Sequence, residues 1–398
     1  MKKLVSALLA ALSCLLSTSA PAFAAKTITD AMLGQMIMAC FDGTSLKPDA
    51  PIMQAVRAGR VGGVILFDIK RHGAGVMNIT SVKQTAKLVR TLREAAPGRF
   101  LIAVDQEGGT VRRLHPKHGF RDCPSAARLG RGKPQATQAD AFATGRELAA
   151  IGINVDFAPV ADVNVNPDCP IIGKRQRAFS SDPKVCAAHA LAYGRGLAQA
   201  GVIPALKHFP GHGSSTKDSH WDFVDITKTW TEAELIPYRE AFAQDWPGMV
   251  MTNHLYNANI DDKYPASLSR AAVQGLLREK LGFEGVVVSD SLLMRAVTDH
   301  YTLEETVELV VTSGTDIVLA ASNDPPDPKL HERVFAVLRR LADEGKLTYE
   351  RVKLSNDRIA ALYDRFAKIA PQLYPHAAAD AKPVKTGKTG TEANVRRP

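Results

Sequence analysis

One short segment, residues 207–220, carries the side chains best suited to chemistry. Its sequence, KHFPGHGSSTKDSH, holds three histidines, two lysines and an aspartate. Because histidine has an unperturbed pKa close to neutrality, several on a bending segment next to a carboxylate indicate proton transfer or metal binding. Pro210, Gly211 and Gly213 disfavour a helix here. We therefore expect the end of this segment to lie on a mobile loop that follows a strand.

Alternating apolar patterns predict the elements that must position this segment. Short runs rich in Val and Ile predict buried strands, and segments with apolar residues at helical spacing predict helices between them. The predicted strands lie at 61–67, 101–105, 153–160, 202–209, 248–255, 285–290 and 316–321, and the clearest helices at 80–96, 138–152, 185–201 and 268–282. Such alternation is typical of an α/β fold with a parallel sheet. No GxGxxG fingerprint follows the first strand, so we predict a single-domain (β/α)8 TIM-like barrel whose eighth strand is hidden or irregular.

Polar residues follow the predicted strands at their C-terminal ends. They are Asp105, Lys207 with His208, Asn253 with His254, and Asp290. Any one of them taken alone reads as a loop residue or a helix N-cap. In a parallel barrel, however, these ends converge on the face where active sites lie. Four polar strand ends therefore predict a catalytic rim.

Several motifs carry a family resemblance. They are AVDQEGGTVRRL (103–114), FAPVADVNVNP (157–167), RAFSSDP (177–183), KHFPGHGSSTKDSH (207–220), YPASLSR (264–270), LREKLGFEGVVVSDSLLM (277–294) and the DHY at 299–301. In this order they resemble the glycoside hydrolase family 3 β-N-acetylglucosaminidases, over nearly all of residues 30–340. The resemblance implies a retaining exo-β-N-acetylglucosaminidase without a cofactor or metal. Its implied substrate is β-linked N-acetylglucosamine in peptidoglycan or muropeptide fragments.

The resemblance also implies roles for matching positions. Asp290 corresponds to the nucleophile that forms a covalent glycosyl-enzyme, and Asp218 with His220 corresponds to the acid/base dyad. The positions implied to bind sugar hydroxyls are Asp105, Arg113, Arg177, Lys207 and His208. The link from Ile172-Gly173 to Arg177 is longer than is usual in the family. Whether Arg175 or Arg177 contacts substrate is therefore open.

The residue types suit this chemistry. Retention requires an anionic nucleophile on one face of the sugar and a proton donor at the leaving oxygen. Asp290 follows a strand, and we expect nearby Lys207 or Arg177 to keep its pKa low. A histidine donates a proton near neutral pH without the burial that a carboxylic acid needs. Asp218 lies two residues before His220, so a turn lets its carboxylate fix the imidazole tautomer.

Other functions fit parts of the same pattern. A family 3 β-glycosidase or phosphorylase of other specificity would use the same groups, since a histidine, unlike a carboxylate, does not repel phosphate as the acceptor. A metal-dependent hydrolase would use His208, His212, His220 and Asp218 as ligands, although Lys207 opposes a cation beside His208. A non-catalytic cell-wall sugar-binding protein would have no need of Asp290.

The two ends of the chain differ from its middle. Residues 1–24 have two lysines, an apolar run and a small-residue end, the pattern of a cleavable secretory signal. We expect an exported, periplasmic or secreted protein without a transmembrane segment, and rank lipoprotein anchoring at Cys14 second. Residues 25–370 form the predicted barrel, and 371–398 a flexible basic tail. Much of the net charge of +9 lies in these ends, so this charge does not indicate nucleic-acid binding. We expect a monomer that binds a sugar substrate and no nucleic acid.

Four cysteines remain after the predicted signal, at positions 40, 123, 169 and 186. None has the close spacing of a zinc ribbon or a redox motif. Cys123 and Cys169 each precede a proline in a loop-like segment, and an oxidising compartment would allow a disulfide between them. We treat that bond as a hypothesis.

Overall fold

The computed structural model describes residues 26–70, 75–321 and 326–377. The predicted signal, residues 1–24, and the alternative anchoring site at Cys14 lie outside these residues, so cleavage and anchoring both stay predictions. Eight parallel strands form one sheet in the order β10-β1-β2-β3-β6-β7-β8-β9. Their bounds are β1 Ile37–Ala39, β2 Gly63–Leu66, β3 Leu101–Val104, β6 Val155–Asp156, β7 Ile203–Phe209, β8 Met249–Thr252, β9 Val287–Ser289 and β10 Val318–Ala320. The amide of Ser289 donates to the Ile317 carbonyl at 3.0 Å and joins the last two strands, so the sheet closes into the predicted barrel.

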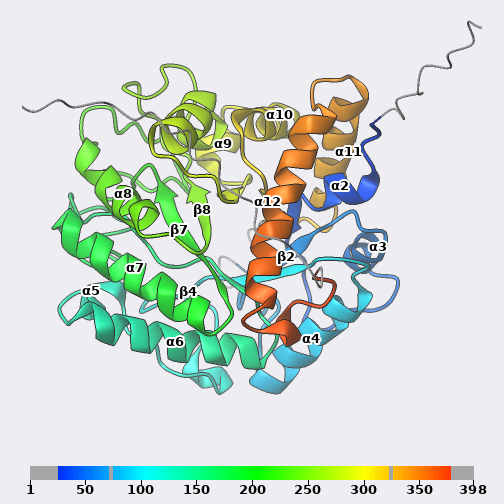
Figure 1. Ribbon diagram of the computed structural model, residues 1–398, viewed down its shortest axis with the longest axis horizontal. Helices are drawn as coiled ribbons and strands as arrows, with labels where there is room; N and C mark the ends of the chain where they lie inside the picture. The colour runs from blue at the N-terminus through cyan, green and yellow to red at the C-terminus, as the bar shows by residue number, and fades with distance from the viewer. Residues whose placement is uncertain (1–25, 71–74, 322–325, 378–398) are drawn as a thin grey trace, which may run out of the picture.

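Helices surround this barrel (Figure 1). Those of seven or more residues are α3 Pro51–Arg57, α4 Val82–Ala95, α6 Pro134–Ala150, α7 Pro183–Gln199, α8 Ile236–Ala243, η5 Ala271–Lys280, α10 Leu303–Ser313, α11 Leu330–Asp343 and α12 Tyr349–Ala367. The shorter ones are α2 Asp30–Gly34, η2 Pro116–His118, α5 Ala126–Leu129, η3 Glu232–Leu235, η4 Ala266–Leu268, α9 Arg295–Thr298 and η6 Pro371–Leu373. A two-stranded hairpin, β4 Gln106–Gly108 with β5 Val111–Arg112, follows β3. The four helices expected from the sequence correspond to α4, α6, α7 and η5, the last with π-helical geometry.

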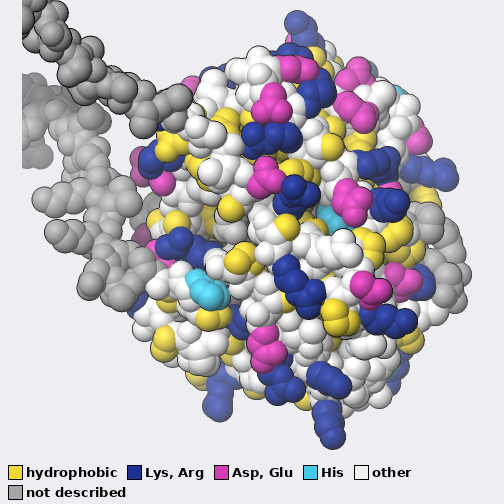
Figure 2. Space-filling view, turned by 90° about the vertical axis from the view of Figure 1, so that its right-hand side faces the viewer, with side chains coloured by type: hydrophobic (Ala, Val, Ile, Leu, Met, Phe, Trp, Pro, Cys, Tyr) yellow, Lys and Arg dark blue, Asp and Glu magenta, His cyan; other side chains and the backbone are white. Residues whose placement is uncertain are grey.

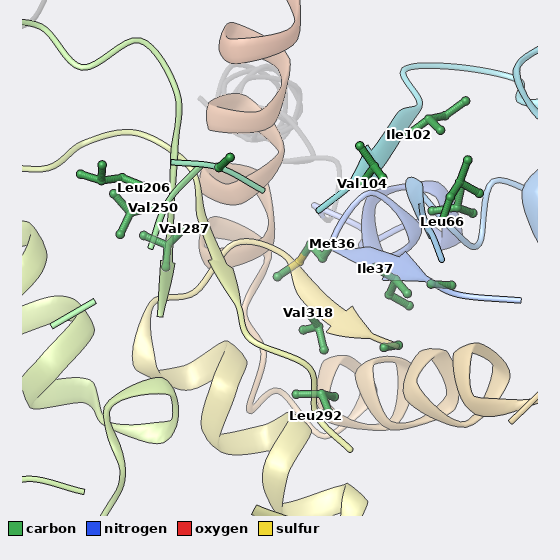
Figure 3. Close-up of a cluster of buried hydrophobic side chains, with 14 of the residues drawn as sticks. Met36, Ile37, Leu66, Ile102, Val104, Leu206, Val250, Val287, Leu292 and Val318 are labelled. Atoms are coloured by element: carbon green, nitrogen blue, oxygen red, sulfur yellow. The ribbon is translucent and has the colours of Figure 1, made fainter. Parts of the chain in front are cut away.

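The side chains of each strand alternate between two apolar clusters, as the period of two in a strand requires. One cluster joins strand residues such as Leu66, Val104 and Val287 to the surrounding helices, and Figure 3 shows part of it. The other holds the residues between them, such as Ile65 and Val288, and fills the barrel interior. The parity of a residue along its strand therefore decides whether it faces the helices or the interior.

The strand missing from the sequence prediction is β1, Ile37–Ala39, which pairs with β2 and β10. It has only three residues and lies in the run Met36-Ile37-Met38, which lacks the Val and Ile pattern of the others. The structure also corrects the start of the predicted tail. Residues Pro371–Leu373 form η6, and the Tyr374 hydroxyl donates to the Gly201 carbonyl at 2.8 Å. Residues 371–377 therefore pack beneath the barrel, together with α12.

The hypothesised disulfide is wrong, because Cys123 and Cys169 are both free thiols and both are buried. The thiol of Cys123 lies near Thr144, and that of Cys169 lies 3.1 Å from the Ser215 hydroxyl. In the part of the chain that the structure describes, no helix has the length and apolar character to cross a membrane. On the face shown in Figure 2, basic and acidic side chains are interspersed. The positive charge is therefore not gathered on that face.

Candidate active site

A cavity of about 570 Å³ opens at the C-terminal ends of the strands. Interior-facing residues, among them Ile65, Phe157, Met251 and Leu319, form its floor. Asp105, Lys207 and Asp290 continue the interior parity of Ala103, Ala205 and Val288, so their side chains point into this cavity. The other predicted site residues that line it are Arg113, Arg177, His208 and His220.

Two carboxylates and three cations form a network on one side of the cavity. The ammonium of Lys207 lies 2.8 Å from Asp105 Oδ1 and 2.7 Å from Glu107 Oε1. Arg113 Nη2 lies 3.2 Å from Asp105 Oδ2, and the Arg177 guanidinium binds Glu107 through two contacts of 2.8 Å. Burial raises the pKa of Glu107, but Arg177 and Lys207 outweigh it and lower that pKa to about 2. The network therefore stays ionised and presents fixed donors and acceptors to a ligand.

Lys207 is buried within this network. Burial lowers its pKa, but Asp105 and Glu107 outweigh burial, so the pKa is raised. The same ion pairs act on Asp105: burial raises its pKa, and Lys207 with Arg113 lowers it well below the usual range. A buried lysine that stays charged beside two carboxylates holds their geometry through electrostatic attraction.

A third carboxylate, Asp162, is buried and holds the start of the histidine-rich segment. Its Oδ1 accepts hydrogen bonds from the amides of His208 and His212 at 3.1 and 2.9 Å. Its Oδ2 lies 2.6 Å from His208 Nδ1, and His208 Nε2 lies 3.3 Å from Arg177 Nη2. Asp162 therefore orients the His208 ring toward the ion-pair network.

The end of the same segment carries the expected Asp218 and His220 pair. His220 Nδ1 lies 2.7 Å from Asp218 Oδ1, which also accepts the His220 amide at 2.9 Å. Burial raises the pKa of Asp218, but the hydrogen bond from His220 outweighs it and lowers that pKa to about 2. The amides of Arg295 and Ala296 donate to the carbonyls of His220 and Ser219, at 3.4 and 3.3 Å. These contacts dock the loop onto the start of α9.

Asp290 follows β9, and its amide donates to the Thr252 carbonyl of β8 at 3.0 Å. Its Oδ1 accepts the Ser291 amide at 2.7 Å. Burial raises the pKa of Asp290, but His254, His208 and His220 outweigh it and the pKa is lowered. The predicted direction of the pKa shift was therefore correct, but the groups named for it, Lys207 or Arg177, were wrong. The nearby histidines lower this pKa instead. The carboxylate is ionised and shares the cavity with His220.

The structure separates the predicted strand-end residues into two groups. His254 does not line the cavity: its Nδ1 lies 2.6 Å from the Ser267 hydroxyl and its Nε2 2.8 Å from the Ser291 carbonyl. Three residues that support the site, Glu107, Asp162 and Glu234, were not predicted from the sequence. Glu107 and Asp162 had a signal, since each lies inside a motif that carries the family resemblance, whereas Glu234 had none. Both Arg175 and Arg177 line the cavity, but Arg175 is exposed whereas Arg177 is buried.

The histidines proposed as metal ligands have other partners. His212 Nδ1 lies 3.0 Å from the Ser215 hydroxyl and its Nε2 3.1 Å from that of Ser219. Both ring nitrogens of His208 are also engaged, by Asp162 and Arg177. Within residues 26–70, 75–321 and 326–377, no group of three His, Cys, Asp or Glu side chains is placed to hold a metal ion. The donor set therefore favours a hydrogen-bonded loop over a metal site.

Removing Arg177 should destabilise the protein, because Glu107 would then be buried with Lys207 alone. We expect Arg177→Ala to lower the free energy of unfolding by about 3 kcal/mol, as for other broken buried ion pairs. Urea denaturation measures this change. The matched control is Arg175→Ala, an exposed arginine two residues away that should change it by no more than about 0.5 kcal/mol. Equal losses in both variants would contradict this assignment.

Glu234, in η3, supports the same loop from below. Its Oε2 accepts the Gly213 amide at 3.0 Å, and a side chain on Gly211, whose φ is +129°, would collide with the Glu234 side chain. Burial raises the pKa of Glu234 to about 8, so this carboxyl is protonated at neutral pH. Glu234 therefore acts as a neutral support for the Gly211–Gly213 bend.

A raised folded-state pKa gives a defined pH dependence. Protonation of Glu234 stabilises the fold fully below the unfolded pKa of about 4.5, and this contribution is lost as the pH rises through about 8. We expect Glu234→Gln, which stays neutral, to flatten the decline of Tm between about pH 4.5 and pH 8. Differential scanning calorimetry measures both curves. Parallel curves for wild type and variant would contradict this assignment.

A parallel barrel whose C-terminal face brings together an ionised carboxylate and a carboxylate-paired histidine has the arrangement of an acid–base catalyst. A model of the glycosyl hydrolase family 3 N terminal domain matches residues 28–362 of the chain. The chain therefore belongs to glycoside hydrolase family 3.

Individual relatives extend this similarity. Beta-hexosaminidase A of Pseudoalteromonas piscicida is 32% identical over 396 residues, covering 89% of this chain and 64% of the relative. A beta-hexosaminidase of Tolumonas auensis is 36% identical over 281 residues, covering 69% of this chain and 80% of the relative. The solved structure of a family 3 beta-N-acetylglucosaminidase from Paenibacillus sp. str. FPU-7 matches with a TM-score of 0.78 and 32% identity, covering 92% of this chain and 66% of that one. The chain thus spans about two thirds of the first relative and of this structure.

Proposed function

We propose that this protein is a retaining exo-β-N-acetylglucosaminidase in which Asp290 is the nucleophile and His220 the general acid and base. The observation that carries the proposal is the cavity that Asp290 shares with His220, whose Nδ1 is paired with Asp218. Asp290 is ionised and held at a strand end, and His220 presents Nε2 while Nδ1 is engaged by Asp218. Such a pair fits the two roles that retention requires.

In the first step, an Asp290 carboxylate oxygen attacks the anomeric carbon and the glycosidic C–O bond breaks. The Nε2 proton of His220 passes to the leaving oxygen, so the leaving group departs as an alcohol. The imidazole is then neutral and the sugar is esterified to Asp290. Asp218 keeps the Nδ1–H donor in place, which fixes Nε2 as the site that exchanges the proton.

In the second step, water attacks the same carbon from the side that the leaving group has vacated. Nε2 accepts a proton from this water, and the Asp290 carboxylate is released. Two inversions at one carbon give net retention of the β configuration. The imidazolium is thereby restored for the next cycle.

The ion-pair network is well suited to hold the sugar. The Asp105 carboxylate can accept hydrogen bonds from sugar hydroxyl groups, and the Arg113 guanidinium can donate them. Asp105 and Arg113 have side chains 15% and 24% exposed, and Lys207 and Arg177 are buried behind them. We assign Asp105 and Arg113 to direct hydroxyl contacts, with Lys207, Arg177 and His208 forming the inner wall.

The comparisons support the N-acetylglucosamine specificity, because the relatives carry beta-hexosaminidase and beta-N-acetylglucosaminidase names. We further propose that the substrates are peptidoglycan or muropeptide fragments met after export. Phosphorolysis is a second candidate, because the neutral imidazole of His220 does not repel phosphate as the acceptor, whereas a carboxylate base would.

Release of chromophore from aryl β-N-acetylglucosaminide and from the matching aryl β-glucoside tests the specificity. We expect the N-acetyl substrate to be hydrolysed at least about a hundredfold faster, because differential binding of one polar group is worth several kcal/mol. The anomer first formed, followed by proton NMR, should be β. Equal rates on both sugars would contradict the specificity, and an α product would contradict retention. Added phosphate that yields the sugar 1-phosphate would favour phosphorolysis.

A further inference from the structure

An exposed tryptophan borders the cavity directly after the proposed acid. Trp221 is 42% exposed, although large apolar side chains are usually buried, and it lines the cavity beside His220. An indole held in contact with solvent at the mouth of a sugar-sized cavity offers a flat apolar face to a ligand.

Arg295, the first residue of α9, contacts this indole. Its guanidinium carbon lies 5.8 Å from the centre of the Trp221 ring, and its amide donates to the His220 carbonyl at 3.4 Å. Arg295 is itself exposed and lines the cavity. Trp221 and Arg295 therefore have a defined position relative to the proposed acid.

The proposed reaction determines what lies at this position. His220 must reach the glycosidic oxygen, so the leaving group has to lie beside the His220 loop. The ion-pair network around Lys207 is deeper in the barrel and is suited to the sugar that becomes bound to Asp290. The side chains next to His220 on the outer side of the cavity are then the ones that a leaving group meets.

We propose that Trp221 and Arg295 form the binding site for the leaving group, and that this group is a sugar ring carrying a carboxylate. This proposal rests on the proposed glycosidase function. The indole would stack on the apolar face of the ring, and the guanidinium would pair with the carboxylate. The charges at the rim agree with an anion, since Arg175 and Arg295 are both exposed there and Asp299 is the exposed acid beside them.

A different role for the same contacts is a latch that holds the His220 loop closed. The two roles predict different kinetics. A latch would be needed for every substrate, because His220 also activates water in the second step. A leaving-group site matters only when the leaving group reaches it. Glycosyl fluoride distinguishes the two roles. Its leaving group is a single atom that would not reach the proposed site, whereas the glycosyl-enzyme formed from it still requires His220 in the second step.

The experiment compares Trp221→Ala and Arg295→Met with wild type on three β-N-acetylglucosaminides. These are the glycosyl fluoride, a disaccharide whose leaving sugar is N-acetylmuramic acid, and the same disaccharide with its carboxylate converted to a carboxamide. We expect Trp221→Ala to lower kcat/KM on both disaccharides about tenfold and to leave the fluoride within about twofold. Arg295→Met should reduce the preference for the carboxylate over the carboxamide about tenfold.

Lys217→Ala is the matched control, because Lys217 is an exposed residue of the same loop that pairs with Asp222. It should leave all three rates within about twofold. Equal losses on the fluoride and the disaccharides would overturn the proposal in favour of a latch. Unchanged disaccharide rates in both variants would also overturn it. Failure of the glycosidase function itself would show differently, as wild-type protein that hydrolyses neither the fluoride nor an aryl N-acetylglucosaminide.

Discussion

Asp290→Ala is expected to lower kcat on aryl β-N-acetylglucosaminides by at least about a thousandfold, since loss of a covalent nucleophile is among the largest single-residue effects in enzymes. The physical reason is that the other carboxylates in the inner part of the cavity are held in ion pairs. Asp105 and Glu107 line the same cavity but are bound to Lys207, Arg113 and Arg177. Initial rates of chromophore release measure the loss.

Azide distinguishes a lost nucleophile from a damaged fold. In Asp290→Ala, azide has room to attack the anomeric carbon in place of the carboxylate. It should restore turnover and give the α-glycosyl azide, because only one inversion then occurs. Asp299→Asn, at an exposed carboxylate that also lines the cavity, is the control and should stay within a few fold of wild type. A folded Asp290→Ala variant with wild-type activity would exclude Asp290 as the nucleophile.

His220→Ala should lower kcat by about 10² to 10⁴ on substrates with poor leaving groups, the usual range for a lost general acid. The loss should shrink for an aryl leaving group of low pKa, such as dinitrophenolate, because that group departs without a proton. Binding of free N-acetylglucosamine should change little, since the ion-pair network remains. Rates across a series of aryl glycosides measure the dependence on leaving-group pKa.

Asp218→Asn tests the other half of this pair. The carboxylate fixes the imidazole tautomer through a 2.7 Å contact, and an amide does so less well. We expect a smaller fall than for His220→Ala and the same dependence on the leaving group. Asp222→Asn is the control, since Asp222 lies on the same loop but pairs with exposed Lys217. An identical rate loss for good and poor leaving groups would contradict acid catalysis by this dyad.

The sequence alone led to the barrel because strand and helix patterns alternate and each strand buries both faces. Runs such as GVVVSD, at residues 285–290, are apolar on both sides, as strands between a helix layer and a filled interior must be. The three-residue β1 gave no such signal. Its place in the sheet is set by pairing with β2 and β10, which are far from each other in the chain.

The sequence also determined most of the candidate site. A residue that directly follows a strand of a parallel barrel is placed at the catalytic face by the fold, so Asp105, Lys207 and Asp290 could be recognised. Each lies two residues after a position that faces the barrel interior, so the alternation of side chains along a strand points it inward as well. The motif around Asp218 and His220 is local, and their contact needs only a turn.

The tertiary structure alone decided which groups act on one another. Glu107, Asp162 and Glu234 hold Arg177, His208 and Gly213 across 70, 46 and 21 residues of chain, and no local pattern in the sequence shows which residues pair over such separations. His254 continues β8 like the other strand-end residues, yet it turns to Ser267 and Ser291. Docking of the His220 loop on Arg295 and Ala296 depends on the distance between two loops. Burial and long-range charge set these pairings, and both exist only once the barrel has closed.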